Sequence, residues 1–398
     1  MRASRPWLFA FFVLGYILLS AGPAWQKVSG AKHGRDFATY HYAAAQALDG
    51  ESPYDTQALS KRARAEKTRK SVHPYFYPPP FLLSVLWSPS LSLSTAYKAF
   101  FGLNQLALLG CLLIFRAWFR APWLVLGVLA LSFTPITDNA KMGQANVLVM
   151  LAAVLGLWLR QGAAVGVAAM AKMSPALYLF AFAAQRAWRP ILAAIAVAIG
   201  SSLLVLPWVD LATQMQFYTE ILPGFSTGHY HGLTVKIALP ANHSIPDMFN
   251  QVWPGPNRHA LSSSAQWASK VTSLSFLALL CWLARHRRDR LGEAGLFGAF
   301  TVLSLVTPVY TYEHHLVMAL FPAVVVGTAL LEGRLGRVGW LVGLPAIFFT
   351  GWPLYWLRPL QKVLPDLHWW LQESKFFGLM ALGVLCALTA INSPKEKA

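Results

Sequence analysis

The chain is poor in charge. Only 12% of its 398 residues are Asp, Glu, Lys or Arg, whereas 56% are hydrophobic. A soluble domain typically carries about 25% charged residues. So few charges cannot cover so much apolar surface in water, which excludes a soluble fold of this length. We therefore expect lipid to surround most of the chain.

Cysteine is scarce as well. Cys111, Cys281 and Cys386 each lie inside an apolar run. No CxxC spacing accompanies them, so neither a disulfide framework nor a cysteine-ligated metal site is indicated. We expect three small core or lipid-facing residues. The sequence also lacks internal repeats and low-complexity tracts, which predicts a single domain over residues 1–398.

The net charge of +17 raises the possibility of a nucleic-acid partner. The basic residues, however, are scattered in short clusters at the ends of apolar runs, a pattern that orients membrane proteins. We therefore expect membrane lipids as partners and no nucleic acid. The exception is the run from Lys61 to Lys70. It is either a solvated amphipathic helix or a surface that attracts anionic lipid headgroups or a lipid phosphate.

Apolar segments recur along the whole chain. The first runs from Trp7 to Ala21, and others lie near 79–93, 96–115, 122–136, 144–159, 163–184, 190–207, 266–284, 292–308, 314–331, 338–351 and 372–391. Two long polar loops, 24–77 and 208–265, interrupt them. The pattern predicts an all-α polytopic membrane protein with about 10–12 transmembrane or re-entrant helices.

Two segments contain features that break a helix. Tandem prolines open segment 79–93, and Lys172-Met173-Ser174-Pro175 interrupts segment 163–184. Proline removes a helical hydrogen bond, and a lysine at membrane depth has to face protein or a water-filled cavity. Both segments can therefore enter and leave on one side, although full crossings are the alternative.

The positive clusters predict the orientation. Arg2 and Arg5 keep the N-terminus in the cytoplasm. If the two broken segments are re-entrant, the later clusters are cytoplasmic too: Arg116/Arg120, Arg160, Arg186/Arg189, the run 285–290, Arg334/Arg337 and Lys395/Lys397. Under either alternative the two long loops face away from the cytoplasm. We expect a multi-pass plasma-membrane protein whose functional site is extracytoplasmic.

The first polar motif, Gly34 to Tyr42, follows the first helix closely and contains Arg35, Asp36 and Tyr40. An acid held at the interface beside an arginine can be ionised and can serve as a base. The alternative is an ordinary salt bridge within a loop.

Two further motifs follow. Tyr75-Phe76-Tyr77 precedes tandem prolines that form a stiff entry into the membrane. Its rings suit the membrane interface, but they can also stack on a sugar or hold a prenyl chain. In Lys141-Met142-Gly143-Gln144-Ala145-Asn146, the side chains of Gln144 and Asn146 either cap a helix, bond a neighbouring helix or bond a substrate hydroxyl.

The remaining motifs are the lysine in the broken helix and a pair of loop motifs. Lys172 can neutralise a phosphate, or it can be structural. Asn242-His243-Ser244 lies in the second long loop, and the stretch Thr307 to His315 ends in His314 and His315. Adjacent helical residues point about 100° apart and no HxxxH spacing is present, so we predict no metal site. Hydrogen bonds to a hydroxyl or phosphate suit these histidines better.

The ordered set of motifs resembles glycosyltransferase family 87. The motifs are Asp-Phe with Tyr, Gly-x-x-Pro-Tyr, Tyr-x-Pro-Pro-Phe, Gly-Gln-x-Asn, Lys-x-x-Pro, Asn-x-Ser and Thr-Pro-x-x-x-Tyr-x-His-His, and the resemblance extends from about residue 34 to 331. Members of this family are polyprenyl-phosphate-mannose-dependent mannosyltransferases of the GT-C fold. One departure is His243, where the family pattern has Gln.

The resemblance implies a glycosyltransferase that moves a hexose, by family default mannose, from a polyprenyl-phosphate sugar donor to a hydroxyl of a lipid or glycan acceptor. It implies no cofactor. Asp36 matches the catalytic base, Lys172 can stabilise the leaving phosphate, and His314 and His315 can contact phosphate or hydroxyl. The other expected substrate-binding residues are Arg35, Tyr40, Tyr77, Gln144, Asn146, Asn242 and Ser244.

Two other functions compete with this one. A transporter or flippase of a lipid-linked saccharide would more often show repeat symmetry and ionisable residues reached from both faces. A non-catalytic assembly subunit would not need the Asp36 carboxylate. The absence of a repeat and the gathering of polar motifs on one side favour the transferase.

Overall fold

The computed structural model describes residues 6–28, 34–227, 236–237, 239–257, 259–286, 288–353, 359, 363–364 and 367–393. Within these ranges every regular element is a helix, so the predicted all-α membrane protein is confirmed. Arg2, Arg5, Lys395 and Lys397, used above to predict the orientation, fall outside these ranges.

The helices follow the predicted segments closely. The N-terminal part contains α1 (Pro6–Tyr16), η1 (Ile17–Ala21), α2 (Gly22–Val28), α3 (Arg35–Leu48), α4 (Thr56–Ala65), η2 (Pro79–Ser84) and η3 (Ser88–Ser90). The middle part contains α5 (Leu93–Phe119), α6 (Trp123–Ser132), α7 (Pro135–Met142), α8 (Asn146–Leu159), α9 (Gly162–Ala171), η4 (Ser174–Leu177), α10 (Tyr178–Ala184) and α11 (Trp188–Leu204). The C-terminal part contains α12 (Leu211–Gln216), η5 (Phe217–Ile221), α13 (Leu222–Thr227), α14 (Ile245–Val252), α15 (Ser263–Ala284), α16 (Arg290–Val306), η6 (His315–Ala319), α17 (Leu320–Leu331), α18 (Gly336–Gly351), α20 (His368–Gln372) and α21 (Ser374–Ile391).

Among the described residues, α5, α15 and α21 are long and apolar enough to cross a membrane, and α6 with α7 forms a further candidate bent by 50°. Shorter apolar helices occupy four of the other predicted segments, 144–159, 163–184, 190–207 and 314–331. The two segments expected to be broken are broken. Segment 79–93 contains the short 3-10 turns η2 and η3, and segment 163–184 is interrupted between Ala171 and Ser174.

Apolar side chains both fill the interior and cover the outside. Inside, α16 packs on α17 and α21, and α9 lies between α8 and α11. Outside, large aliphatic side chains point away from the protein, such as Leu192 on α11 (64% exposed) and Leu274 on α15 (63% exposed). Bare apolar faces of this kind are stable in lipid and costly in water.

Several arginine clusters lie together at one end of the helices. Arg160, at the end of α8, bonds Glu293 near the start of α16 and also Gln185 after α10. Arg334, after α17, pairs with Asp289, which also bonds Ser393 beyond α21. This grouping supports the predicted common side of the clusters.

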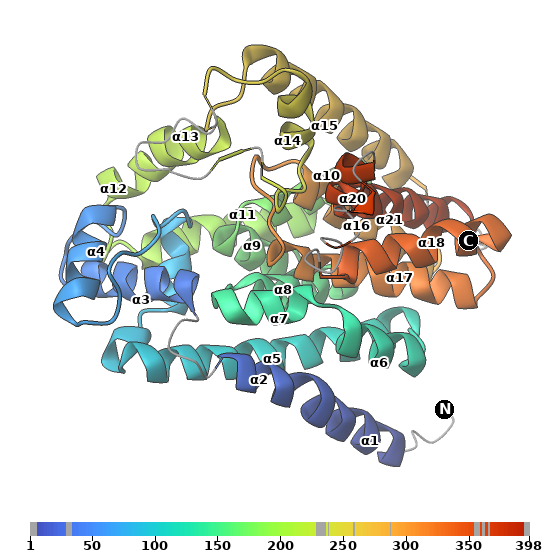
Figure 1. Ribbon diagram of the computed structural model, residues 1–398, viewed down its shortest axis with the longest axis horizontal. Helices are drawn as coiled ribbons and strands as arrows, with labels where there is room; N and C mark the ends of the chain where they lie inside the picture. Colours follow the sequence, from blue (N-terminus) through green and yellow to red (C-terminus); the bar gives the residue numbers. More distant parts are fainter. Residues whose placement is uncertain are drawn as a thin grey trace.

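The two long polar loops pack against each other. Tyr54 of the first loop stacks on Phe217 of the second at 5.7 Å between ring centroids, and Phe76 lies 4.6 Å from Phe225. Figure 1 shows α3 and α4 at one end of the long helix α5, with α16, α17, α18 and α21 gathered toward the other end. The two loops therefore contact each other through aromatic side chains.

Candidate active site

A close backbone approach sets the position of α3. The Gly34 N–H donates to the Lys141 carbonyl over 2.7 Å, and both Gly34 (φ +73°) and Gly143 (φ +70°) have left-handed backbones. A Cβ on Gly143 would lie 2.6 Å from Cβ of Phe37. Only glycine fits here, and the contact brings the first turn of α3 beside Gln144.

Gln144 joins the predicted base to two predicted tyrosines. Its side-chain N–H donates to Oδ2 of Asp36 over 2.6 Å. Its carbonyl oxygen accepts from the Tyr77 hydroxyl at 2.6 Å, and the Tyr40 hydroxyl lies 3.0 Å from the same oxygen and 2.6 Å from the Tyr77 hydroxyl, to which it donates. Because two phenols occupy the amide oxygen, the amide nitrogen has to face the carboxylate. The structure therefore brings four of the predicted site residues into one network.

Asn146 organises a second network. Its carbonyl oxygen accepts from Nζ of Lys172 at 2.6 Å, and its amide donates to Oδ1 of Asn139 and to the backbone carbonyl of His314, each at 3.0 Å. Gln144 and Asn146 are two residues apart at the start of α8. The Gly-Gln-x-Asn motif thus holds the acid on one side and the lysine on the other.

The two networks share one electrostatic environment. The charge of Asp36 acts on both Lys172 and His314, and Lys172 acts on His314 as well. Within the described part of the chain, Oδ1 of Asp36 accepts no hydrogen bond, so this oxygen can accept one from a ligand. Arg35 is exposed, and its charge acts on Arg69.

The two histidines differ in their surroundings. Their rings lie 4.3 Å apart between centroids at 75°. Nδ1 of His315 accepts the Tyr312 N–H at 3.2 Å, and this ring also bonds the backbone of Tyr310. His315 is therefore tied to its own turn. The charge of Lys172 acts on both rings, whereas the charge of Asp36 acts on His314.

Asn242 and Ser244 are buried away from the Asp36 network. Asn242 donates to the Val309 carbonyl at 2.9 Å and accepts the Thr311 N–H at 2.8 Å. Ser244 donates to the same Val309 carbonyl at 3.0 Å and caps α14 by accepting the Asp247 N–H. Both side chains therefore hold the loop that carries the two histidines. Among the described residues, neither side chain hydrogen-bonds Asp36 or Lys172.

Sequence reasoning missed a buried ion network behind this loop. Glu313 lies 3.0 Å from Nε2 of His243 and 2.6 Å from Nζ of Lys375, whose side chain is 1% exposed. The histidine at position 243, a departure from the family pattern, thus has a carboxylate partner. Lys375 lies near the start of the apolar segment 372–391 and could have been noted as a lysine within an apolar segment, as Lys172 was in the middle of 163–184. Asn139 and Asp247 had no such signal.

The structure also describes the three cysteines and the side chains that could bind a metal ion. Cys111 and Cys386 are buried, Cys281 is half-buried, and all three are free thiols. In the described ranges, no three His, Cys, Asp or Glu side chains are grouped closely enough to hold a metal ion.

Three characterised mycobacterial proteins are similar to the chain. A Mycobacterium tuberculosis "polyprenol-phosphate-mannose-dependent alpha-(1-2)-phosphatidylinositol mannoside mannosyltransferase" is 26% identical over 96% of this chain and 90% of its own length. A pentamannoside mannosyltransferase of the same species is 28% identical over 57% of this chain and 52% of its own length. Its Mycolicibacterium smegmatis counterpart is 27% identical over 59% of this chain and 56% of its own length.

No solved structure matches the chain significantly. The family model described as "Glycosyltransferase family 87" matches residues 75–309, which is more than half of the chain. The resemblance read from the motifs is therefore confirmed, and the protein belongs to glycosyltransferase family 87.

Proposed function

We propose that this glycosyltransferase moves a mannosyl residue from a polyprenyl-phosphate-linked donor to a hydroxyl of a lipid or glycan acceptor, with Asp36 as general base. The supporting observation is that Asp36, held by Gln144, lies within electrostatic reach of Lys172 and His314. The donor follows the printed names of the three relatives, and their phosphatidylinositol mannoside acceptors suggest an acceptor of the same class.

The reaction forms one bond and breaks another at the anomeric carbon. Asp36 takes the proton from the acceptor hydroxyl as that oxygen attacks C1 of the sugar. The bond from C1 to the phosphate oxygen breaks, its electron pair leaves with the polyprenyl phosphate, and the configuration at C1 inverts. Oδ1 of Asp36 is the oxygen that receives the proton, because Oδ2 already accepts from Gln144.

Negative charge grows on the leaving phosphate, and cationic groups stabilise it. Lys172 suits this role, since Asn146 holds its ammonium group near the acid rather than in contact with it. His314 lies in the same surroundings and can donate a hydrogen bond to phosphate. Lys172 and His314 thus form the donor side of the site, with Asp36 between them and the acceptor.

We also propose that the site faces the extracytoplasmic side of the plasma membrane. The supporting observations are the common end shared by the arginine clusters of Arg160 and Arg334 and the packing of the two long loops against each other. Positive clusters favour the cytoplasm, so the opposite end of the helices, with Asp36, belongs outside.

The test of the base is Asp36→Asn. Membranes carrying the variant are incubated with radiolabelled polyprenyl-phosphate-mannose and lipid acceptors, and labelled product is counted. We expect a rate about 10²- to 10⁴-fold lower, because a general base contributes that much. Asp49→Asn is the matched control, since Asp49 ends the same helix and pairs with Arg62 at the surface. Full activity of Asp36→Asn would eliminate the proposed base.

Orientation is tested by single cysteines placed in loops 24–77 and 208–265 of a cysteine-free chain. A membrane-impermeant thiol reagent should label them in intact cells, and protection until the cells are opened would contradict the proposed side. Transport of a labelled lipid-linked saccharide without any glycosidic product would instead indicate the transporter.

A further inference from the structure

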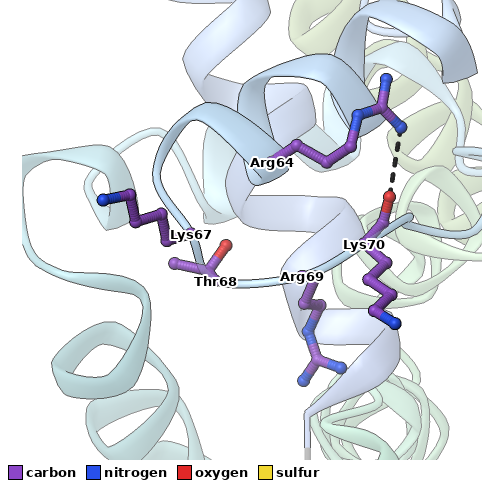
Figure 2. A pocket seen from close by; sticks show the side chains of 5 residues that line it. All are labelled: Arg64, Lys67, Thr68, Arg69 and Lys70. Carbon is purple, nitrogen blue, oxygen red and sulfur yellow. Dashed lines mark hydrogen bonds between the residues drawn. The ribbon is translucent and has the colours of Figure 1, made fainter.

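A basic hollow lies beside α3, the helix that carries Asp36 in its first turn, and is outside the networks described above; Thr68 in its lining hydrogen-bonds the Tyr42 hydroxyl of α3 at 2.5 Å. It has a volume of about 250 Å³, and Arg64, Lys67, Thr68, Arg69 and Lys70 line it. Figure 2 shows Arg64 in the last turn of α4 and Lys67, Arg69 and Lys70 on the segment that follows it, with the Arg64 guanidinium donating to the Lys70 carbonyl over 3.1 Å. We call these five residues the basic pocket.

Glu66, the acidic residue in this stretch, does not neutralise the charges of the pocket. Glu66 accepts a hydrogen bond from the Tyr42 hydroxyl at 3.0 Å and lies 3.7 Å from Nε of Arg62. Arg62 in turn pairs with Asp49. Neither Glu66 nor Asp49 lines the pocket, so its lining carries four positive charges and no negative one. An anion is therefore the ligand class that this lining fits.

Arg69 connects the pocket to the site. It is half-buried, and burial together with the neighbouring Arg35 guanidinium lowers its pKa, which indicates that two like charges are held close together. The charge of Asp36 also acts on Arg69. The charge of Asp36 thus acts both on Lys172, which is not among the pocket residues, and on Arg69, which is. A ligand in the pocket therefore contacts a different set of cations from the one assigned above to the donor phosphate.

The depth of the pocket points to a lipid. Arg69 lies within electrostatic reach of Tyr97, in the first turns of α5, a helix long enough to cross the membrane. Tyr97 in turn packs on the Gly34 backbone. The pocket therefore lies toward the N-terminal end of a helix long enough to cross the membrane, and lipid phosphates lie at the ends of such helices.

From these observations we propose that the basic pocket binds the phosphodiester of a glycerophospholipid acceptor and so presents the acceptor's sugar or headgroup hydroxyl to Asp36. This inference rests on the proposed function, which supplies the reaction. It adds a recognition element for the acceptor that is separate from the groups facing the donor phosphate.

The experiment compares two charge reversals in the same segment. Lys70→Glu alters the pocket, whereas Lys61→Glu alters an exposed lysine of α4 that does not line it. Transfer from polyprenyl-phosphate-mannose is measured to a phosphatidylinositol mannoside and to octyl α-mannoside, which has no phosphate. The readout is the ratio of kcat/KM for the phosphorylated acceptor to that for the neutral one.

We expect this ratio to fall about tenfold or more in Lys70→Glu, because a charged hydrogen-bond partner is replaced by a like charge. It should stay within about twofold of wild type in Lys61→Glu, since that charge is screened by water and salt. Lys70→Arg should restore the ratio. An unchanged ratio in Lys70→Glu, an equal fall in Lys61→Glu, or a raised KM for the donor would overturn the proposal.

A binding assay separates this inference from the proposed function. Fluorescent phosphatidylinositol is titrated into detergent-solubilised protein, with inorganic phosphate as competitor. We expect saturable binding that Lys70→Glu weakens and that inorganic phosphate competes for only weakly. Equal competition by inorganic phosphate would make the ligand a free phosphate and reject the lipid. Binding by wild type without any mannosyl transfer would reject the transferase while keeping the pocket.

Discussion

Gln144 and Asp36 are 108 residues apart in the chain, yet the Gln144 amide donates a 2.6 Å hydrogen bond to the Asp36 carboxylate. The hydroxyls of Tyr40 and Tyr77 hold the other end of the same amide. Gln144 therefore holds the carboxylate of the proposed base and leaves its Oδ1 oxygen to face a ligand.

Replacing Gln144 should lower catalysis without removing the acid. We expect Gln144→Leu to reduce kcat about 10- to 100-fold, because a hydrogen bond to a charged group contributes about 1.5–3 kcal/mol. Gln144→Glu should be worse, since it sets a second carboxylate against Asp36. Steady-state kinetics in proteoliposomes measures both. If Gln144→Glu were as active as wild type, the positioning role would be rejected.

Gly143 should tolerate a methyl group less well than Gly50. Both have left-handed backbones, with φ of +70° and +76°, so alanine costs about 1–2 kcal/mol in backbone strain at either position. Only at Gly143 would the Cβ collide, 2.6 Å from Cβ of Phe37, whereas Gly50 has open space.

We therefore expect Gly143→Ala to lower both the apparent melting temperature and kcat, because Gln144 is displaced with it. Gly50→Ala should lower stability slightly and leave kcat near that of wild type. Thermal unfolding in detergent and transfer assays measure the two effects. Equal kcat values in the two variants would contradict the close approach of α3 to Gly143.

The buried pair of Glu313 and Lys375 should be needed for stability. Glu313→Gln leaves the Lys375 ammonium, 1% exposed, without its carboxylate, and breaking a buried pair in this way costs about 3–5 kcal/mol. The double variant Glu313→Leu/Lys375→Met removes both charges and should recover part of that loss. The surface pair of Arg62 and Asp49 is the control, because Arg62→Gln should cost less than about 1 kcal/mol. Unfolding in detergent measures all three, and equal losses would argue against a buried network.

Asp247 should make stability depend on pH. Burial, and secondarily the charge of Glu373, raises the pKa of Asp247 to about 8 in the folded protein. In the unfolded chain an aspartate has a pKa of about 3.9. Between these values the folded state binds more protons than the unfolded state, so the free energy of unfolding falls as pH rises from about 4 to about 8.

Asp247→Asn should therefore have almost the same melting temperature as wild type at or below about pH 4, and the difference in its favour should grow as the pH rises to about 8. Asp210→Asn is the contrasting control, because hydrogen bonds with Thr213 lower the pKa of Asp210 and no gain is expected there. Melting temperatures are measured in detergent across this range. A difference between wild type and Asp247→Asn that stays constant with pH would contradict a buried, protonated Asp247.

The membrane class, the helix positions and the broken segments could all be predicted from local sequence. Apolar runs have to be helical in lipid because every backbone polar group needs an internal partner. The proline after Lys172 removes a helical hydrogen bond, so the break after Ala171 needed no tertiary information. The motif order identified the family for the same reason: residue types and spacing are visible along the chain.

The roles of individual side chains needed the fold. Asn242 and Gln144 both looked like pocket-lining amides, yet Asn242 braces a loop whereas Gln144 holds the acid. Which amide meets which partner depends on how distant segments pack, and no local pattern encodes that. The pairing of Lys375 with Glu313 was invisible for the same reason.

The sequence by itself determined that this protein is embedded in lipid, that it is helical and to which family it belongs, because these properties depend on composition, periodicity and motif order. Only the tertiary structure decided that Asp36, Lys172 and His314 share one environment and that a basic pocket adjoins it. The physical reason is that electrostatic and hydrogen-bonding partners are defined by distance in space, and two glycines more than a hundred residues apart set that distance.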